Sequence, residues 1–188
     1  MIALEVTNEL QLAINTWRTA IQESAYRQKS LRDDQKALDD QFIKWGGNLR
    51  DKLLPGLAKG ELDMFNSISP GKDVWIGKNI KKGFQYSFWI TKDTLRAELR
   101  IDFGKEMDDY NMQVFEELKS HQDEIHKIYG KELEWNEAEG YRVCIIREVF
   151  TTGGYRSPLS EWDAISSEAI NSMKRLSLAT KEIIKKIM

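Results

Sequence analysis

The feature that most constrains the fold is a two-residue alternation of apolar and polar side chains over residues 84–103. Apolar or aromatic residues occupy the even positions from 84 to 90 and the odd positions from 95 to 103. Successive side chains of a strand point to opposite faces, so this pattern predicts two strands that share one buried face. The polar pair Lys92-Asp93 between them predicts a tight turn and therefore an antiparallel hairpin.

Three shorter segments predict further strands around this hairpin. Residues 74–77 precede it and are joined to it by the basic segment GKNIKKG. Residues 133–135 follow as a short candidate, and residues 141–150 form a longer one. The last segment is apolar on both faces, which is typical of a central strand flanked by neighbours.

Apolar residues at helical spacing predict long helices on both sides of the strands. The predicted helices cover residues 7–28, the segment from Leu38 to Leu53, residues 106–129, and a final helix from Ser157-Pro158 to about residue 187. The polar stretch 28–33 is compatible with a turn or with a continuous helix. One further helical turn is expected at Leu62–Phe65.

The predicted fold class is α+β, with a small antiparallel sheet flanked by long α-helices, an N-terminal helical pair and a long C-terminal helix. We expect an N-terminal helical segment, residues 1–60, that packs on or extends from an α+β domain of residues 61–188. The one cysteine, Cys144, has no internal disulfide partner and lies among apolar strand residues, so we expect a buried thiol in a reducing compartment. No apolar run is long enough to span a bilayer and the N-terminus is a poor signal peptide, which together predict a cytoplasmic protein.

Sequence motifs exclude several common chemistries. There is no glycine-rich phosphate loop, no GxSxG, no HExxH and no CxxC. We therefore expect no cofactor. The net charge of −2 argues against a general polyanion binder, although residues 66–105 are locally basic and residues 106–140 are acidic.

The polar face of the predicted hairpin is the best candidate for a binding site. Trp89 shares that face with two arginines, and three lysines lie near one end of it; an aromatic ring among cations is able to stack a base and hold phosphates. The predicted nucleic-acid contact residues are Lys78, Lys81, Lys82, Trp89, Arg96 and Arg100. The alternative is that Trp89 is covered by helices and the arginines are paired with Glu98 and Asp102.

Two other site hypotheses use carboxylates. A divalent-metal nuclease would need Asp93 and Glu98 to converge, with Asp102 as a third group. Glu98 is otherwise expected to pair across strands with Arg142 or a neighbouring basic residue. A weaker metal-site hypothesis uses Glu117, His121 and Glu124, which recur at spacings of four and three along one helix.

Several blocks carry a resemblance to a known family. They are WIG (75–77), FQYSFWI (84–90), LRAELRI (95–101), FEELKSHQDEIHKIYGKELEW (115–135), YRVCIIRE (141–148) and Trp162 in the last helix. Over residues 75–162 the chain resembles the bacterial and archaeal family called domain of unknown function 4268. Members occur as short free-standing proteins and appended to nuclease-like domains in defence-type proteins, so the resemblance implies an accessory or recognition module linked to nucleic-acid processing.

The sequence therefore predicts a non-enzymatic binding or accessory module. Its expected partner is another protein or a second copy of itself, with nucleic acid as the next candidate and no membrane. A structural role is the remaining alternative, in which the amphipathic helices within 7–53 and 159–187 build a dimer.

Overall fold

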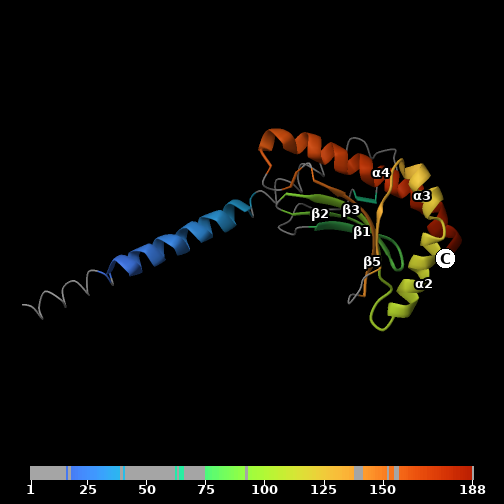
Figure 1. Cartoon of the computed structure of the whole chain (residues 1–188), viewed down its shortest axis with the longest axis horizontal. Helices are drawn as coiled ribbons and strands as arrows, with labels where there is room; N and C mark the ends of the chain where they lie inside the picture. The colour runs from blue at the N-terminus through green and yellow to red at the C-terminus, as the bar shows by residue number, and fades with distance from the viewer. Residues whose placement is uncertain are drawn as a thin grey trace, which may run out of the picture. The chain divides into compact units, whose positions relative to one another are not determined.

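The computed structural model of the chain describes residues 16, 18–38, 40, 62, 64–65, 75–91, 93–137, 142–151, 153–154 and 157–187. The chain divides into two compact units, residues 1–40 and 41–188. In the first unit residues 18–38 are one continuous helix, shown in blue in Figure 1, so the polar stretch 28–33 continues the helix. The second predicted helix and the predicted boundary near residue 60 lie outside the described residues.

The second unit is built on a five-stranded antiparallel sheet, and the α+β prediction is confirmed. Its order is β1-β2-β3-β5-β4. The strands are β1 (Trp75–Lys81), β2 (Phe84–Ile90), β3 (Leu95–Ile101), β4 (Glu134–Asn136) and β5 (Cys144–Phe150). As predicted, the strand within residues 141–150 has a neighbour on each side, β3 and β4.

One face of the sheet forms the core. The alternation in β2 and β3 aligns Phe84 with Ile101, Tyr86 with Leu99, and Phe88 with Ala97 across the hairpin. All of these side chains are buried. Helix α4 (Trp162–Ile187) lies along this face, and α2 (Asp108–Lys119) and α3 (Gln122–Tyr129) pack beside it (Figure 1). We call this the covered face.

The buried face of α4 includes the polar residue Thr180, and its contacts explain why a hydroxyl is found there. Thr180 is fully buried, and its hydroxyl lies 2.7 Å from the hydroxyl of Tyr86 on β2. The same Thr180 hydroxyl donates to the carbonyl of Leu176 at 2.7 Å. A polar residue at this point of α4 thus satisfies the one polar side-chain atom of Tyr86 inside the core.

The helix predicted over residues 106–129 is two helices. The helix is interrupted at Ser120 and His121. There the N–H of Ser120 still donates to the carbonyl of Glu116, and the N–H of His121 donates to the carbonyl of Leu118. In α3 the buried residues are Ile125 and Tyr129, whereas Ile128 is 48% exposed. Gly130 ends α3 in the left-handed conformation, which glycine adopts without strain.

Two other boundaries differ from the sequence prediction. β1 extends to Lys81, so only Lys82 and Gly83 remain as the turn to β2. The last helix begins at Trp162 after a short 3₁₀ turn (Leu159–Glu161), and Ser157 does not cap it. Instead, the Ser157 hydroxyl accepts a hydrogen bond from Gly154, and its carbonyl accepts one from the Trp162 indole.

Two smaller predictions are confirmed. Leu62 and Phe65 form a helical turn, in which the N–H of Phe65 donates to the carbonyl of Leu62 at 3.0 Å, and Phe65 packs on Phe88. Cys144 is a buried thiol, and burial raises its pKa. Among the helices in the described part of the chain, none has the length and apolar character needed to cross a membrane.

Candidate functional site

The face of the sheet that points away from α4 carries polar and aromatic side chains in register, and we call it the open face. One row across the strands runs Trp75, Trp89, Arg96. A second row runs Gly77, Ser87, Glu98, Arg147 and Glu134, and a third runs Asn79, Gln85 and Arg100. The alternation therefore places Trp89 beside Arg96 and Arg100 on one face, as the sequence predicted.

Two tryptophans stack on this face. The rings of Trp75 and Trp89 lie 6.3 Å apart between centroids, at an interplanar angle of 20°. The Trp75 side chain lies along β1 over Gly77. A Cβ atom added at Gly77 would come within 2.6 Å of the Trp75 ring. Glycine at position 77 thus makes room for the Trp75 ring, which remains 40% exposed.

A cleft of about 680 Å³ opens beside this pair at the β1–β2 turn. Its lining combines the two aromatic rings with three cationic side chains and several amide and carboxylate groups. The lining residues are Trp75, Asn79, Ile80, Lys81, Lys82, Gly83, Phe84, Gln85, Trp89, Arg100 and Asp102. Volume and composition both suit a small polar or charged ligand group.

Of the six predicted nucleic-acid contacts, the structure brings four together in the cleft: Lys81, Lys82, Trp89 and Arg100. Arg96 lies on the same face, directly opposite Trp89. Lys78 differs, because it is paired with Tyr86 in the register and so belongs to the other face of β1. The open-face set is therefore smaller than predicted by one lysine.

A buried carboxylate lies at the centre of the open face. Glu98 is 1% exposed and contacts Arg100 at 3.3 Å and Arg147 at 4.0 Å. Burial raises the pKa of Glu98, and the nearby guanidinium groups of Arg100, Arg147 and Arg96 oppose that rise. The expectation of a neighbouring basic partner is confirmed, but the partner is not Arg142, which pairs with Asp102 at 2.7 Å.

The open face also holds polar atoms that have no partner. Within the described residues, four buried side-chain nitrogen or oxygen atoms make no hydrogen bond: Ser87 Oγ, Trp89 Nε1, Arg96 Nε and Arg147 Nε. The register places all four on the open face. Three of them are N–H groups that act only as donors, and none of the three has an acceptor among the residues that the structure describes.

The carboxylates of the nuclease hypothesis do not converge. Glu98 and Asp102 are four residues apart along one extended segment, which separates them by roughly 13 Å, and Asp93 lies beyond the opposite end of β3. Asp102 lines the cleft but is held by Arg142 and by the N–H of Gly104. Burial alone would raise the pKa of Asp102, yet these hydrogen bonds lower it overall.

The three residues of the metal-site hypothesis, Glu117, His121 and Glu124, do not lie on one continuous helix. His121 Nδ1 lies 3.5 Å from a carboxylate oxygen of Glu124, but His121 is at the break between α2 and α3, and Glu117 belongs to the preceding helix. The helical spacing that related the three residues in the sequence is therefore interrupted. Across the described ranges, no three His, Cys, Asp or Glu side chains gather as a metal site.

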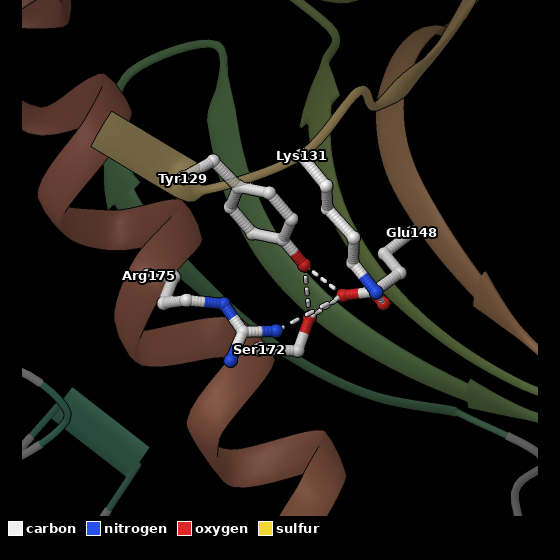
Figure 2. Close-up of polar contacts among 5 residues, drawn as sticks. All are labelled: Tyr129, Lys131, Glu148, Ser172 and Arg175. Carbon is white, nitrogen blue, oxygen red and sulfur yellow. Dashed lines mark hydrogen bonds and ion pairs between the residues drawn. The ribbon is translucent and has the colours of Figure 1, made fainter. Parts of the chain in front are cut away.

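A second polar cluster lies on the covered face and was not anticipated from the sequence (Figure 2). Glu148 on β5 is 7% exposed and accepts hydrogen bonds from Tyr129 of α3 and from Ser172 of α4, the latter at 2.8 Å. Lys131 and Arg175 form ion pairs with the same carboxylate. Figure 2 shows the four side chains converging on Glu148.

This cluster is internally satisfied. The Tyr129 hydroxyl also lies 2.7 Å from the Ser172 hydroxyl, and the Arg175 guanidinium lies over the Tyr129 ring at 5.1 Å. Burial, together with the hydrogen bond to Glu148, raises the pKa of Tyr129 to about 12. A carboxylate already matched by two donors and two cations is suited to holding α3 and α4 on the sheet, not to receiving a ligand.

Sequence reasoning missed Trp75, Asn79 and Gln85 as parts of the site. The signal was present, because Trp75, Gly77 and Asn79 continue the alternation once β1 extends to Lys81. In the structure the side-chain amide of Gln85 donates to Asn79 at 3.0 Å. Arg147 was also missed, since it reaches Glu98 only through the pairing of β3 with β5, which the sequence does not specify.

Comparison with known proteins supports a family assignment. No curated protein and no solved structure matches the chain. The family model described as "Domain of unknown function (DUF4268)" matches residues 51–184. This span is wider than the resemblance seen over residues 75–162 and includes every strand, α2, α3 and most of α4. The family suspected from the sequence is thereby confirmed, and the chain belongs to the DUF4268 family.

Proposed function

We propose that the chain is a non-enzymatic accessory module that binds short single-stranded nucleic acid on the open face of its sheet. The observation that carries the proposal is the stacked Trp75–Trp89 pair bordering a cleft with Lys81, Lys82 and Arg100. Association with nucleic-acid processing, implied by the family resemblance, is compatible with such a role.

The aromatic pair supplies the base-binding part of the proposal. A half-exposed indole on a flat sheet face offers a surface on which an unpaired base stacks, at roughly 1–3 kcal/mol per base. The Arg100 guanidinium lies 5.6 Å from the centre of the Trp89 ring and so adds a cation beside the stacking surface. Duplex DNA does not expose its base faces, which favours a single strand as ligand.

The cations and unpaired donors supply the backbone-binding part. Lys81 and Lys82 are exposed at the turn and border the same cleft as the two rings. The unmatched N–H groups of Trp89, Arg96 and Arg147 require acceptors, and phosphate and base oxygens are acceptors. These atoms are buried just below the surface of the open face, so a ligand meets them only where the surrounding side chains move aside.

The proposal is tested by fluorescence anisotropy with a labelled oligothymidylate. We expect binding that weakens with salt, with a slope of log K against log salt concentration of about −2 if three phosphates are neutralised. Trp89→Ala and Arg100→Ala should each weaken binding about tenfold, whereas Lys127→Ala, at an exposed position of α3, should leave it unchanged. Equal losses in all three variants, or no binding by the wild type at low salt, would contradict the proposal.

The same experiment addresses the nuclease alternative based on Asp93, Glu98 and Asp102. We expect the oligonucleotide to remain intact when Mg²⁺ or Mn²⁺ is added. Metal-dependent cleavage that is abolished by Glu98→Ala would overturn the non-enzymatic assignment and leave the binding surface in place.

A further inference from the structure

The helix of residues 18–38 carries an apolar stripe that its own unit leaves in solvent. Ile21 and Leu31 are 61% and 68% exposed, and every described residue from 18 to 37 is exposed. Most helices in proteins are stabilised chiefly by packing an apolar face against another surface. The exposed stripe therefore calls for a partner surface.

The stripe has the spacing of a coiled coil. Ile21, Gln28 and Gln35 recur every seven residues, and Ser24, Leu31 and Leu38 form the second set three residues later. The pattern continues in the sequence on both sides, through Ile14 and Trp17 before this helix and Phe42 and Trp45 after it. Three of the six seam positions within the helix are apolar (Ile21, Leu31 and Leu38), and apolar residues at a seven-residue repeat favour helix–helix pairing along one seam.

A second copy of the same helix is a partner whose seam has a matching length and pattern. When the segment is paired antiparallel with a copy of itself, Ile21 meets Leu38 and Ser24 meets Gln35, so the outer layers match apolar with apolar and polar with polar, while Gln28 meets Leu31 in the central layers. A turn within residues 28–33 would have let the chain make the Ile21–Leu38 pairing with itself. Residues 18–38 are instead one continuous helix, so Ile21 and Leu38 lie near its opposite ends and cannot pair within one chain.

Flanking charges decide between the two orientations. In an antiparallel pair the positions beside the seam bring Arg27 of one copy to Asp34 of the other, twice by symmetry. In a parallel pair Arg27 would meet Arg32 of the second copy, again twice. Like charges at these positions disfavour pairing and opposite charges favour it.

We propose that the helix of residues 18–38 pairs antiparallel with the same helix of a second copy of this chain, forming a two-fold homodimer. The contact is isologous, as expected for the commonest type of soluble oligomer. Polar residues at the seam, Gln28 and Gln35, are suited to fixing register at some cost in affinity, as polar seam positions do in other coiled coils. This interface uses none of the residues of the open face and does not depend on the nucleic-acid proposal.

The test is the mass of the full chain in solution, measured by light scattering and sedimentation equilibrium. We expect a species of twice the 21.9 kDa chain mass. The double variant Ile21→Glu/Leu31→Glu should return it to the monomer mass with the spectrum of the α+β unit unchanged. A monomeric wild type at every concentration, or a dimer that the double variant does not disrupt, overturns the proposal.

Orientation is tested with charge reversals. Arg27→Glu places like charges together in the antiparallel pair and should raise the dimer dissociation constant about tenfold, because two pairs change from attraction to repulsion. Within the helix the same substitution also replaces the contact between Arg27 and Glu23, which is 3.7 Å in the wild type, with two like charges. Adding Asp34→Arg should restore the dimer to within about threefold of wild type. Tighter association of the single Arg27→Glu variant would indicate a parallel pair and contradict the proposed geometry.

Discussion

Each face of the sheet buries one carboxylate, and the two carboxylates differ in how fully the polar groups around them are hydrogen-bonded. On the covered face Glu148 is matched by two hydroxyl donors and two cations drawn from α3, α4 and the loop after α3. On the open face Glu98 contacts two arginines, yet four polar side-chain atoms around it have no hydrogen-bond partner in the described part of the chain. The difference indicates that the first cluster stabilises the fold, and it agrees with our proposal that the open face contacts a ligand.

The largest effect should come from Glu148→Ala. It removes the common acceptor of Tyr129 and Ser172 and leaves Lys131 and Arg175 without their anion. We expect the free energy of unfolding to fall by about 2–3 kcal/mol in urea denaturation, because two buried hydroxyl groups lose their acceptor, whereas Lys131 and Arg175 are 52% and 40% exposed and stay solvated. Glu132→Ala, at an exposed position of the same loop, is the control and should change little. A loss below about 1 kcal/mol for Glu148→Ala would remove the distinction between the faces.

Tyr129→Phe should have the next largest effect. Loss of the hydroxyl removes the bonds to Glu148 and Ser172 and should cost about 1–2 kcal/mol near neutral pH. The pKa of Tyr129 is raised from 10.0 to about 12, so its contribution is complete below pH 10 and is lost as the pH rises toward 12. The difference in stability between wild type and variant should therefore shrink across that window. Phenolate absorbance provides the check, since the variant should lack a tyrosine that titrates at about pH 12.

Glu98→Gln should change the free energy of unfolding by no more than about 1 kcal/mol at neutral pH. The amide carries no charge to bury, and its oxygen still accepts a hydrogen bond from Arg100. The pKa of Glu98 is raised above 4.5, so the folded state favours the neutral carboxyl. Its stabilising contribution is present below that pH and is lost as the pH rises through the folded pKa. As the pH rises through the folded pKa of Glu98, the wild type should therefore lose stability relative to the variant. The variant should also bind oligothymidylate about threefold more tightly, because it lacks a negative charge on the open face. Destabilisation as large as that of Glu148→Ala would show that both carboxylates are structural.

The smallest effect on stability should come from Gly77→Ala. The added methyl group would lie 2.6 Å from the Trp75 ring, which is partly exposed and free to tilt away. We expect a stability change within about 1 kcal/mol but roughly a three- to fivefold loss of oligothymidylate affinity, because the stacked pair is displaced. Unchanged affinity would exclude Trp75 from the binding surface.

The sheet was predictable from the sequence because alternation reports directly on which face of a strand is buried. It predicted β2, β3 and the placement of Trp89 with Arg96 and Arg100. The break between α2 and α3 was not predictable, since Leu118 and Ile125 keep a helical spacing across it. Local periodicity records burial, not the continuity of a helix.

The buried clusters were beyond the reach of sequence reasoning for a related reason. Glu148, Tyr129 and Ser172 lie on three elements that are distant in the sequence, and none of them interrupts its local pattern in a way that identifies the others. Arg147 reaches Glu98 only because β5 lies between β3 and β4 in the sheet and pairs directly with β3. Tertiary pairing, which no local pattern encodes, brought these residues together.

The most direct test of the central claim is the set of tryptophan indole N–H resonances during titration with oligothymidylate. Trp135 and Trp162 serve as internal controls, because their indoles already donate to His126 and Ser157 at 2.9 Å. The account predicts large shifts for Trp75 and Trp89, with the unpartnered Trp89 N–H moving to the position of a hydrogen-bonded donor, and unchanged control signals. Shifts confined to the controls, or no shift at saturating oligonucleotide, would show that the open face is not the binding surface.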